Sequence, residues 1–402
     1  MTRTVLAGGM VFDGTGAPPA RADVVIAGSR ILDVGSGLDA DDAVDVSGQT
    51  VLPGLFDCHV HFVSSGNLDV LYRVRRPFSL KYYEAIANME ATLRTGITSV
   101  REAAGSDLGV KQAVEEGLVR GPRMQISISM ISQTGGHGDT HMPSGGCFAW
   151  HQSYPGNPSG RVDGPEEMRR RVRELIREGA DVIKVATSGG VLSPRDEPRH
   201  GHFRDDELEV LVAEATAAGR YVMAHAQATD GIKAAVRTGI RSIEHGIYLD
   251  DEAIQMMLDR GTWLVPTLSA PQAVLAASQA GVQVSEEAVR KTHEVIDIHR
   301  ESFRRAVDAG VKVAMGTDSG VGPHGDNLEE LGLMVENSAM TPLEAWAATT
   351  SSAAGLLGVA DDLGTIAPGK LADLVVLDGD AGELEKLSDR ISGVWKDGSR
   401  LV

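Results

Sequence analysis

Eight short β-rich runs alternate with longer helical stretches through the middle of this 402-residue chain. The runs lie at 55–62, 98–103, 123–129, 182–188, 221–227, 242–246, 263–268 and 311–319. The helical stretches between them, such as "PEEMRRRVRELIREGA", close with a Gly-containing turn where a C-cap is expected. Strict alternation over roughly 300 residues predicts an α/β fold of the (β/α)8 TIM-barrel type.

The two ends of the chain differ from this middle part. Residues 1–54 consist of short apolar runs broken by Gly, Asp and Pro, and the tail resembles them in "LADLVVLDGD" and "ISGVWKDGSRLV". We therefore predict a small β domain made from residues 1–54 and 361–402, with the barrel spanning residues 55–360.

Bulk composition excludes several classes of partner. The net charge of −18 argues against binding to nucleic acid or to an anionic membrane. The two cysteines, Cys58 and Cys147, provide no disulfide framework, which indicates a reducing compartment. The first residues lack a long apolar segment, and no apolar run reaches membrane-spanning length. A cytoplasmic protein without a membrane partner is expected.

The first run of the predicted barrel, "LFDCHVHF", contains two histidines. Successive side chains of a strand point to opposite faces, so His59 and His61 would share one face with Asp57. An isolated His-x-His pair is more often two satisfied histidines of a half-buried strand. A metal site requires further ligands elsewhere in the chain.

Further candidate ligands occur within or at the ends of the other runs. They are Lys184, His225, His245 and Asp318. The carboxyl ends of barrel strands meet at one face, so these side chains and the two histidines would converge there. Imidazole and carboxylate suit zinc and similar divalent ions. An ammonium group cannot bind a metal, but a carbamylated Lys184 would offer two oxygens to two ions.

Five segments taken in order resemble the amidohydrolase superfamily of binuclear metal hydrolases. They are "DCHVH", "VIKVATSGG", "MAHA", "SIEHG" and "MGTDSG". The tail "LGTIAPGKLADLVVLDGD" is similar to the β-sandwich segment of that superfamily. "QTGGHGD" and "HGDNLEELGLMVE" resemble the branch that contains imidazolonepropionase-like proteins and metal-dependent Xaa-Pro and Xaa-Arg dipeptidases. The resemblance implies a β-sandwich formed by both termini beside the barrel.

The resemblance also implies roles for individual residues. Two divalent ions, expected to be Zn²⁺, would be held by His59, His61, Lys184, His225, His245 and Asp318, with carbamylated Lys184 and a hydroxide bridging them. Asp318 would take the proton of that hydroxide and pass it to the leaving amine. His137, in "GGHGD", is the candidate for stabilising the developing oxyanion.

Candidate substrate contacts lie in the loops after the strands. Gln227 stands where the branch often has a tyrosine, in a position facing the pocket. Arg195, Arg199 and His202, in the loop after the fourth run, would bind a substrate carboxylate. His324, after the last run, is a further candidate.

The leading hypothesis is therefore a metal-dependent dipeptidase or carboxypeptidase-like enzyme of the Xaa-Pro type, acting on a dipeptide or small molecule and forming a homo-oligomer. The alternative is hydrolysis of a cyclic amide, or of a xenobiotic carbamate, urea or amide, on the same site. Lys184 disfavours a deaminase with a single metal, and the intact ligand set disfavours a non-catalytic relative.

Overall fold

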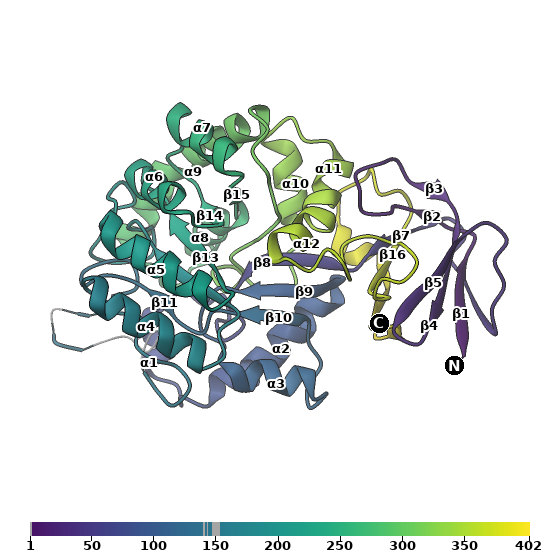
Figure 1. Cartoon of the computed structure of the whole chain (residues 1–402), viewed down its shortest axis with the longest axis horizontal. Coiled ribbons are helices and arrows are strands. Elements are labelled where there is room, and N and C mark those ends of the chain that lie inside the picture. The colour runs from purple at the N-terminus through teal and green to yellow at the C-terminus, as the bar shows by residue number, and fades with distance from the viewer. Residues whose placement is uncertain (1, 140, 143, 147–152) are drawn as a thin grey trace.

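The computed structural model describes residues 2–139, 141, 142, 144–146 and 153–402. Figure 1 shows two parts: a larger body, in which helices surround strands, and a smaller β-rich part to one side that holds both termini. The long loop predicted at 133–161 lies partly outside the described residues, as does Cys147. Across the described residues, no helix combines the length and the apolar character needed to cross a membrane.

The larger body contains two parallel sheets. A three-stranded sheet has the order β10-β9-β8, and a five-stranded sheet has the order β11-β12-β13-β14-β15. Every pairing within them is parallel. The strands are β8 (Leu55–Val60), β9 (Ile97–Glu102), β10 (Arg123–Ile126), β11 (Met130–Ile131), β12 (Val182–Ala186), β13 (Tyr221–Ala226), β14 (Ser242–His245) and β15 (Trp263–Val265). The predicted α/β class is confirmed.

Helices connect and cover these strands (Figure 1). They are α1 (Val70–Val74), α2 (Leu80–Arg94), α3 (Leu108–Glu115), α4 (Pro165–Arg177), α5 (Asp205–Ala217), α6 (Thr229–Thr238), α7 (Asp251–Arg260), α8 (Ser269–Gln279), α9 (Glu286–Asp308), α10 (Glu329–Glu336), α11 (Pro342–Ala348) and α12 (Ser351–Leu357). Helix α4 illustrates the pattern: Pro165 starts it, and Met168, Val172 and Leu175 form its buried face.

Two predicted strands differ from the structure. Of the run 123–129, only Arg123–Ile126 forms a strand, β10, because Ile128 adopts a left-handed backbone conformation with φ 66°; β11 begins after the run, at Met130. The run 311–319 forms no continuous strand. It makes single parallel bridges, from Val313 to Leu264 and from Ser319 to Val60, and therefore lies between β15 and β8.

The smaller part contains a four-stranded sheet, β5-β4-β1-β6, and a six-stranded sheet, β18-β17-β16-β7-β2-β3. Its strands are β1 (Arg3–Ala7), β2 (Met10–Val11), β3 (Ala20–Arg21), β4 (Asp23–Ala27), β5 (Arg30–Gly35), β6 (Asp42–Asp45), β7 (Gln49–Pro53), β16 (Leu374–Asp378), β17 (Ile391–Lys396) and β18 (Ser399–Arg400). The short 3-10 helix η2 (Leu387–Arg390) precedes β17. Strand β7 pairs antiparallel with β16, so segments from the two ends of the chain share one sheet. Leu6, Val24, Val51, Leu374 and Trp395 belong to one apolar cluster that joins both sheets.

The central strands are buried on both faces, as parallel strands covered by helices usually are. All six residues of β8 and all five of β12 are buried. The polar side chains within these strands must therefore find partners inside the protein.

Gly316 allows the segment before Asp318 to approach its neighbours closely. A Cβ atom on Gly316 would lie 2.5 Å from Val265 Cγ1 and 3.0 Å from the backbone nitrogen of His59. The contact is with rigid strand atoms, so the neighbours have little freedom to move. This glycine therefore fixes how near Asp318 comes to the strands on either side.

We predict that Gly316→Ala destabilises the protein by ~1–3 kcal/mol, the usual cost of overpacking a core. Gly332→Ala is the matched control: a Cβ atom there meets nothing within 4 Å on helix α10, and alanine favours a helix interior by about 1 kcal/mol. Thermal unfolding of both variants checks the prediction. Equal melting temperatures for Gly316→Ala and the parent protein would contradict it.

Candidate metal and active site

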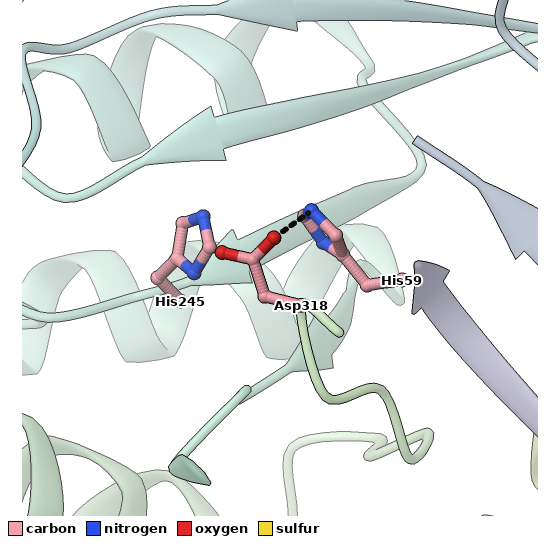
Figure 2. Close-up of side chains that lie close together, drawn as sticks. All are labelled: His59, His245 and Asp318. Atoms are coloured by element: carbon pink, nitrogen blue, oxygen red, sulfur yellow. Dashed lines mark ion pairs between the residues drawn. The ribbon is translucent and has the colours of Figure 1, made fainter. Parts of the chain in front are cut away.

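Three side chains from separate elements meet at the carboxyl ends of the strands. His59 lies on β8, His245 ends β14, and Asp318 follows the segment between β15 and β8. One potential ligand atom from each residue lies within 4.8 Å of the others (Figure 2). Two imidazoles and a carboxylate at this spacing can hold a divalent ion.

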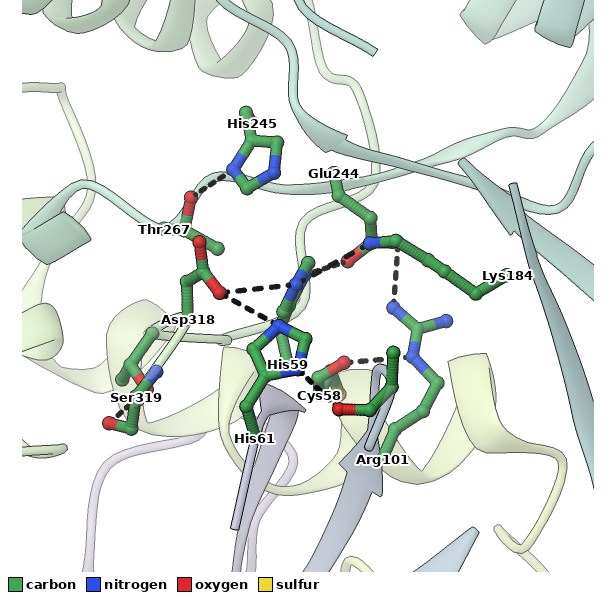
Figure 3. A network of polar contacts seen from close by, with 12 residues as sticks. Cys58, His59, His61, Arg101, Lys184, Glu244, His245, Thr267, Asp318 and Ser319 are labelled. Carbon is green, nitrogen blue, oxygen red and sulfur yellow. Dashed lines mark hydrogen bonds and ion pairs between the residues drawn. The ribbon is translucent and has the colours of Figure 1, made fainter. Parts of the chain in front are cut away.

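The other three predicted ligands adjoin this group. His61 Nε2 lies 3.1 Å from Asp318 Oδ1, and Lys184 Nζ lies 3.4 Å from His59 Nε2. The ring of His225 is 4.7 Å from the ring of His245, centroid to centroid. All six residues singled out in the sequence therefore gather at one place. Figure 3 labels His59, His61, Lys184, His245 and Asp318 of this group.

Each histidine of the group is oriented through one ring nitrogen. His59 Nδ1 contacts Glu244 Oε2 at 2.9 Å, and His61 Nδ1 contacts the carbonyl of Ala104 at 2.8 Å. His245 Nδ1 contacts Thr267 Oγ1 at 2.7 Å, and His225 Nε2 contacts the Gly189 carbonyl at 3.0 Å. The second nitrogen of each ring is left for the cluster, as in histidines that bind metals, and in His61 it contacts Asp318. The donor set therefore fits divalent ions.

Burial determines the charge state of these groups. It lowers the pKa of His59, His225 and His245 well below the usual value, so these imidazoles are neutral and have a free lone pair. Burial raises the pKa of Asp318, but nearby His59 and a hydrogen bond from His61 outweigh that effect and lower it. Burial also lowers the pKa of Lys184 to about 8.

A fully buried ion pair supports His59 from below (Figure 3). Arg101 Nη2 donates to Glu244 Oε1 at 2.7 Å, while the other oxygen of Glu244 contacts His59. Arg101 also donates to the Cys58 carbonyl and to Ser242 Oγ. Sequence reasoning missed this pair. The sequence feature that could have indicated the pair is a charged residue inside each of two apolar runs, Arg101 in "TSVREA" and Glu244 in "SIEHG".

Asp57 serves as an anchor and does not join the ligand group. Its carboxylate accepts hydrogen bonds from the backbone nitrogens of His59 and Thr317, from Thr317 Oγ1 and from Asn327 Nδ2. Burial raises its pKa to about 6 despite these donors. Asp57 thus ties β8 to the residue just before Asp318.

The backbone is strained at three positions around the site. His245, Thr267 and Asp318 have φ angles of 71°, 53° and 60°, in the left-handed region that residues other than glycine seldom occupy. Each such conformation costs ~1–3 kcal/mol and persists only where surrounding contacts enforce it. The strain turns His245 and Asp318 toward the cluster at points where the strands end.

A cavity of about 60 Å³ opens beside the cluster. Its polar lining includes His137, Gln227 and His299, in addition to three residues of the cluster. The remaining lining is mostly apolar: Val191, Leu192, Ile247, Ala270, Pro271, Val274, Val295 and Val321. His137 and Gln227 thus line the cavity, which agrees with their predicted location.

The other predicted substrate contacts do not line this cavity. Arg195 and Arg199 are exposed, and Arg199 lies over the ring of Tyr248. His202 is buried close to Gly136, in the turn that carries His137. His324 stacks on Phe62 and contacts the Ser64 carbonyl. The spacing of residues in a loop does not determine where their side chains point, so the sequence could not show that these four residues lie away from the cavity.

Ligand-type side chains that surround a cavity at the carboxyl ends of parallel strands are typical of a hydrolytic enzyme. The family model described as "Amidohydrolase family" matches residues 50–401, and the chain belongs to this family. The family predicted from the sequence is confirmed.

Three comparisons illustrate the likeness. An ochratoxinase of Aspergillus niger is 36% identical, and the alignment covers 98% of this chain and 86% of that protein. An imidazolonepropionase of Streptomyces griseus subsp. griseus is 27% identical, covering 95% and 92%. A crystal structure of a Xaa-Pro dipeptidase with bound methionine in the active site superposes with a TM-score of 0.91 at 34% identity, over 100% of both chains.

We predict that Glu244→Gln weakens metal binding about 10–100-fold, as expected when the partner of a ligating histidine is changed. It should also lower the melting temperature, because breaking a buried ion pair typically costs ~3–5 kcal/mol. Competition with a chelator and thermal unfolding measure the two effects. Glu301→Gln, which breaks an exposed ion pair with Arg304, is the control. Unchanged metal affinity in Glu244→Gln would disprove the supporting role.

Proposed function

We propose that this enzyme is a binuclear metal-dependent hydrolase that cleaves the amide bond of a small dipeptide-like substrate. The observation that carries the proposal is the gathering of four histidines, a lysine and an aspartate around one point beside a cavity. One nitrogen of each imidazole is anchored by a partner outside the ligand group. His59, His61 and Asp318 would hold one ion, His225 and His245 the other, and Lys184 would link them. Zinc is the expected metal.

When bound, two such ions lower the pKa of an attacking water and polarise the carbonyl of the scissile bond. Asp318 takes a proton from that water and passes it to the leaving nitrogen. Its carboxylate is suited to this role because neighbouring imidazoles keep its pKa low. Burial excludes bulk water from His59 and Lys184, which strengthens electrostatic interactions among the groups.

Lys184 is proposed to act as a carbamate. Its neutral amine would attack carbon dioxide and lose a proton, giving an anion with two oxygens. The lowered pKa, about 8, increases the fraction of neutral amine at physiological pH. The residue is only 2% exposed, so an unmodified ammonium would be a buried charge that is costly to keep away from water.

The cavity supports a substrate with a small apolar group next to the amide. A volume of about 60 Å³ accommodates about four to six water-sized spheres, at ~10–15 Å³ each. A branched aliphatic or prolyl group would fit, and a dipeptide carries such groups on either side of its bond. The Xaa-Pro dipeptidase with bound methionine is in keeping with this proposal.

The second candidate is hydrolysis of a neutral amide, carbamate or urea. No arginine or lysine lines the cavity among the residues that the structure describes. A free carboxylate would find no cationic partner there, whereas a neutral apolar molecule needs none.

We also propose that the two parallel sheets form one (β/α)8 barrel, spanning 55–360, and that residues 1–54 and 361–402 form a β-sandwich. Asp181 N donates to the Ile126 carbonyl, which connects β10 to the start of β12. On the other side, Cys58 N donates to Met315 O and Ala314 N donates to Leu264 O. These bonds support a continuous ring of strands.

The proposed function is tested with zinc-loaded enzyme, a dipeptide library and a set of neutral amides and carbamates. We expect about two metal ions per chain by elemental analysis and the fastest hydrolysis for substrates with aliphatic or prolyl groups. Asp318→Asn should retain most of its metal while kcat falls by ~10²–10⁴-fold. A metal-replete enzyme that hydrolyses none of these compounds would refute the proposal.

Lys184→Ala tests the carbamate bridge. We expect this variant to lose metal and activity, and added metal with a short carboxylic acid to restore part of both, because the acid supplies the missing oxygens. Elemental analysis and turnover follow the two properties. The same acid added to the Asp318→Asn variant should not restore activity. Two tightly held ions and normal turnover in Lys184→Ala would disprove the bridge.

A further inference from the structure

A fully buried lysine holds the loop between β12 and α5 from outside the metal cluster. Lys291, on α9, is 0% exposed. Its Nζ donates to the carbonyls of Ser193, at 2.8 Å, and of Asp196, and it lies 3.4 Å from the Gly190 carbonyl. Glu287 Oε1, at 3.4 Å, and Asp196 Oδ1, at 3.8 Å, balance its charge. A buried cation with this many partners fixes the loop in one conformation.

The loop held by Lys291 contacts His137 through a chain of hydrogen bonds. Ser193 Oγ donates to Asp196 Oδ1 and lies 2.9 Å from His137 Nδ1. The side chain of Asp196 is 3% exposed, so solvent does not compete for it. Ser193 has a single hydroxyl proton. That proton is donated to Asp196 Oδ1 or to the Gly190 carbonyl, which lies 3.1 Å from Ser193 Oγ. The proton between Ser193 and His137 therefore belongs to His137 Nδ1.

Two neighbours restrict the position of the His137 ring. It stacks on His225, with ring centroids 4.0 Å apart and an interplanar angle of 10°. Gly190 also lies close, since a Cβ atom there would be 2.3 Å from the His137 ring. Nδ1 is occupied by Ser193, so Nε2 is the nitrogen left for a substrate in the cavity.

We infer that Ser193, Asp196 and Lys291 are positioning residues that hold His137 as its Nδ1–H tautomer, with the Nε2 lone pair directed to the substrate. The catalytic meaning of this inference rests on the proposed function. A neutral His137 in this form accepts a hydrogen bond and cannot donate one from Nε2. It would pair with an N–H group of the substrate or leaving amine, in place of the oxyanion expected from the sequence.

Double-mutant kinetics test whether Ser193 acts through His137. We expect Ser193→Ala to lower kcat/KM about 10–100-fold, the usual effect of losing a partner that orients a functional histidine. In a His137→Gln background, Ser193→Ala should change kcat/KM by less than about 2-fold, because the two residues act as one unit. If Ser193→Ala lowers kcat/KM by the same factor with and without His137→Gln, the two residues act independently and the inference is overturned.

Arg290→Met is the matched control. Arg290 is the neighbour of Lys291 on α9 and contacts Glu197 of the same loop, but this ion pair is exposed. We expect Arg290→Met to leave kcat/KM within about 2-fold of the parent, since exposed pairs contribute little. Lys291→Met should reduce kcat/KM as Ser193→Ala does. If Lys291→Met fails to fold, the double-mutant cycle of Ser193→Ala and His137→Gln tests the inference by itself. Ser193→Ala removes a single oxygen and should leave the fold intact.

The tautomer itself is read by nitrogen NMR of zinc-loaded enzyme with ¹⁵N-labelled histidine. The signals absent from His137→Gln identify His137 among the 12 histidines. We expect a protonated Nδ1 and an unprotonated Nε2, and a shift toward the Nε2–H form in Ser193→Ala. An Nε2–H form in the parent enzyme would overturn the inference. This measurement needs no substrate, so failure of the proposed function would be seen separately in the hydrolysis screen.

Discussion

The carboxylate of Glu244 is the contact on which the rest of the site depends. It is fully buried, and it joins Arg101 on one side to His59 on the other. Removing two charges from water is costly unless both are paired and hydrogen-bonded, and Arg101 meets that condition with Cys58 and Ser242. The strands β8, β9 and β14 are therefore locked together directly beneath the ligand group. A displacement of any one would leave a charge unpaired in the protein interior.

Above this ion pair, the site is built by the ends of the strands and by the loops that continue from them. Asp57 ties β8 to Thr317 and so sets the place of Asp318, while left-handed residues turn His245 and Asp318 inward. On the far side, Lys291 fixes the loop that carries Ser193. Rigid strands give the imidazoles their positions, and a loop pinned by one cation completes the cavity.

The sequence was informative where periodicity or buried polar residues were involved. Alternation located the strands and helices of the α/β body, and polar residues inside apolar runs located His59, Lys184 and His245. The run 311–319 was not recognisable as irregular, because its left-handed Asp318 is imposed by tertiary contacts. The surroundings of Arg199 and His202 were also inaccessible to sequence reasoning, since a loop has no repeat that fixes the direction of its side chains. Arg101 and Glu244 pair across strands far apart in the chain, which no local pattern reveals.

The pairing of β7 with β16 has a consequence for biosynthesis. Gln49 and Asp378, which contact each other across this pair, are separated by 329 positions. At ~5–20 residues per second, a ribosome needs tens of seconds to cover that distance, and during this time one edge of β7 has no partner. An open strand edge is a template for pairing with other chains. The nascent protein would thus expose this edge of β7 while its catalytic body is being made, and a chaperone that shields β7 would matter during that interval.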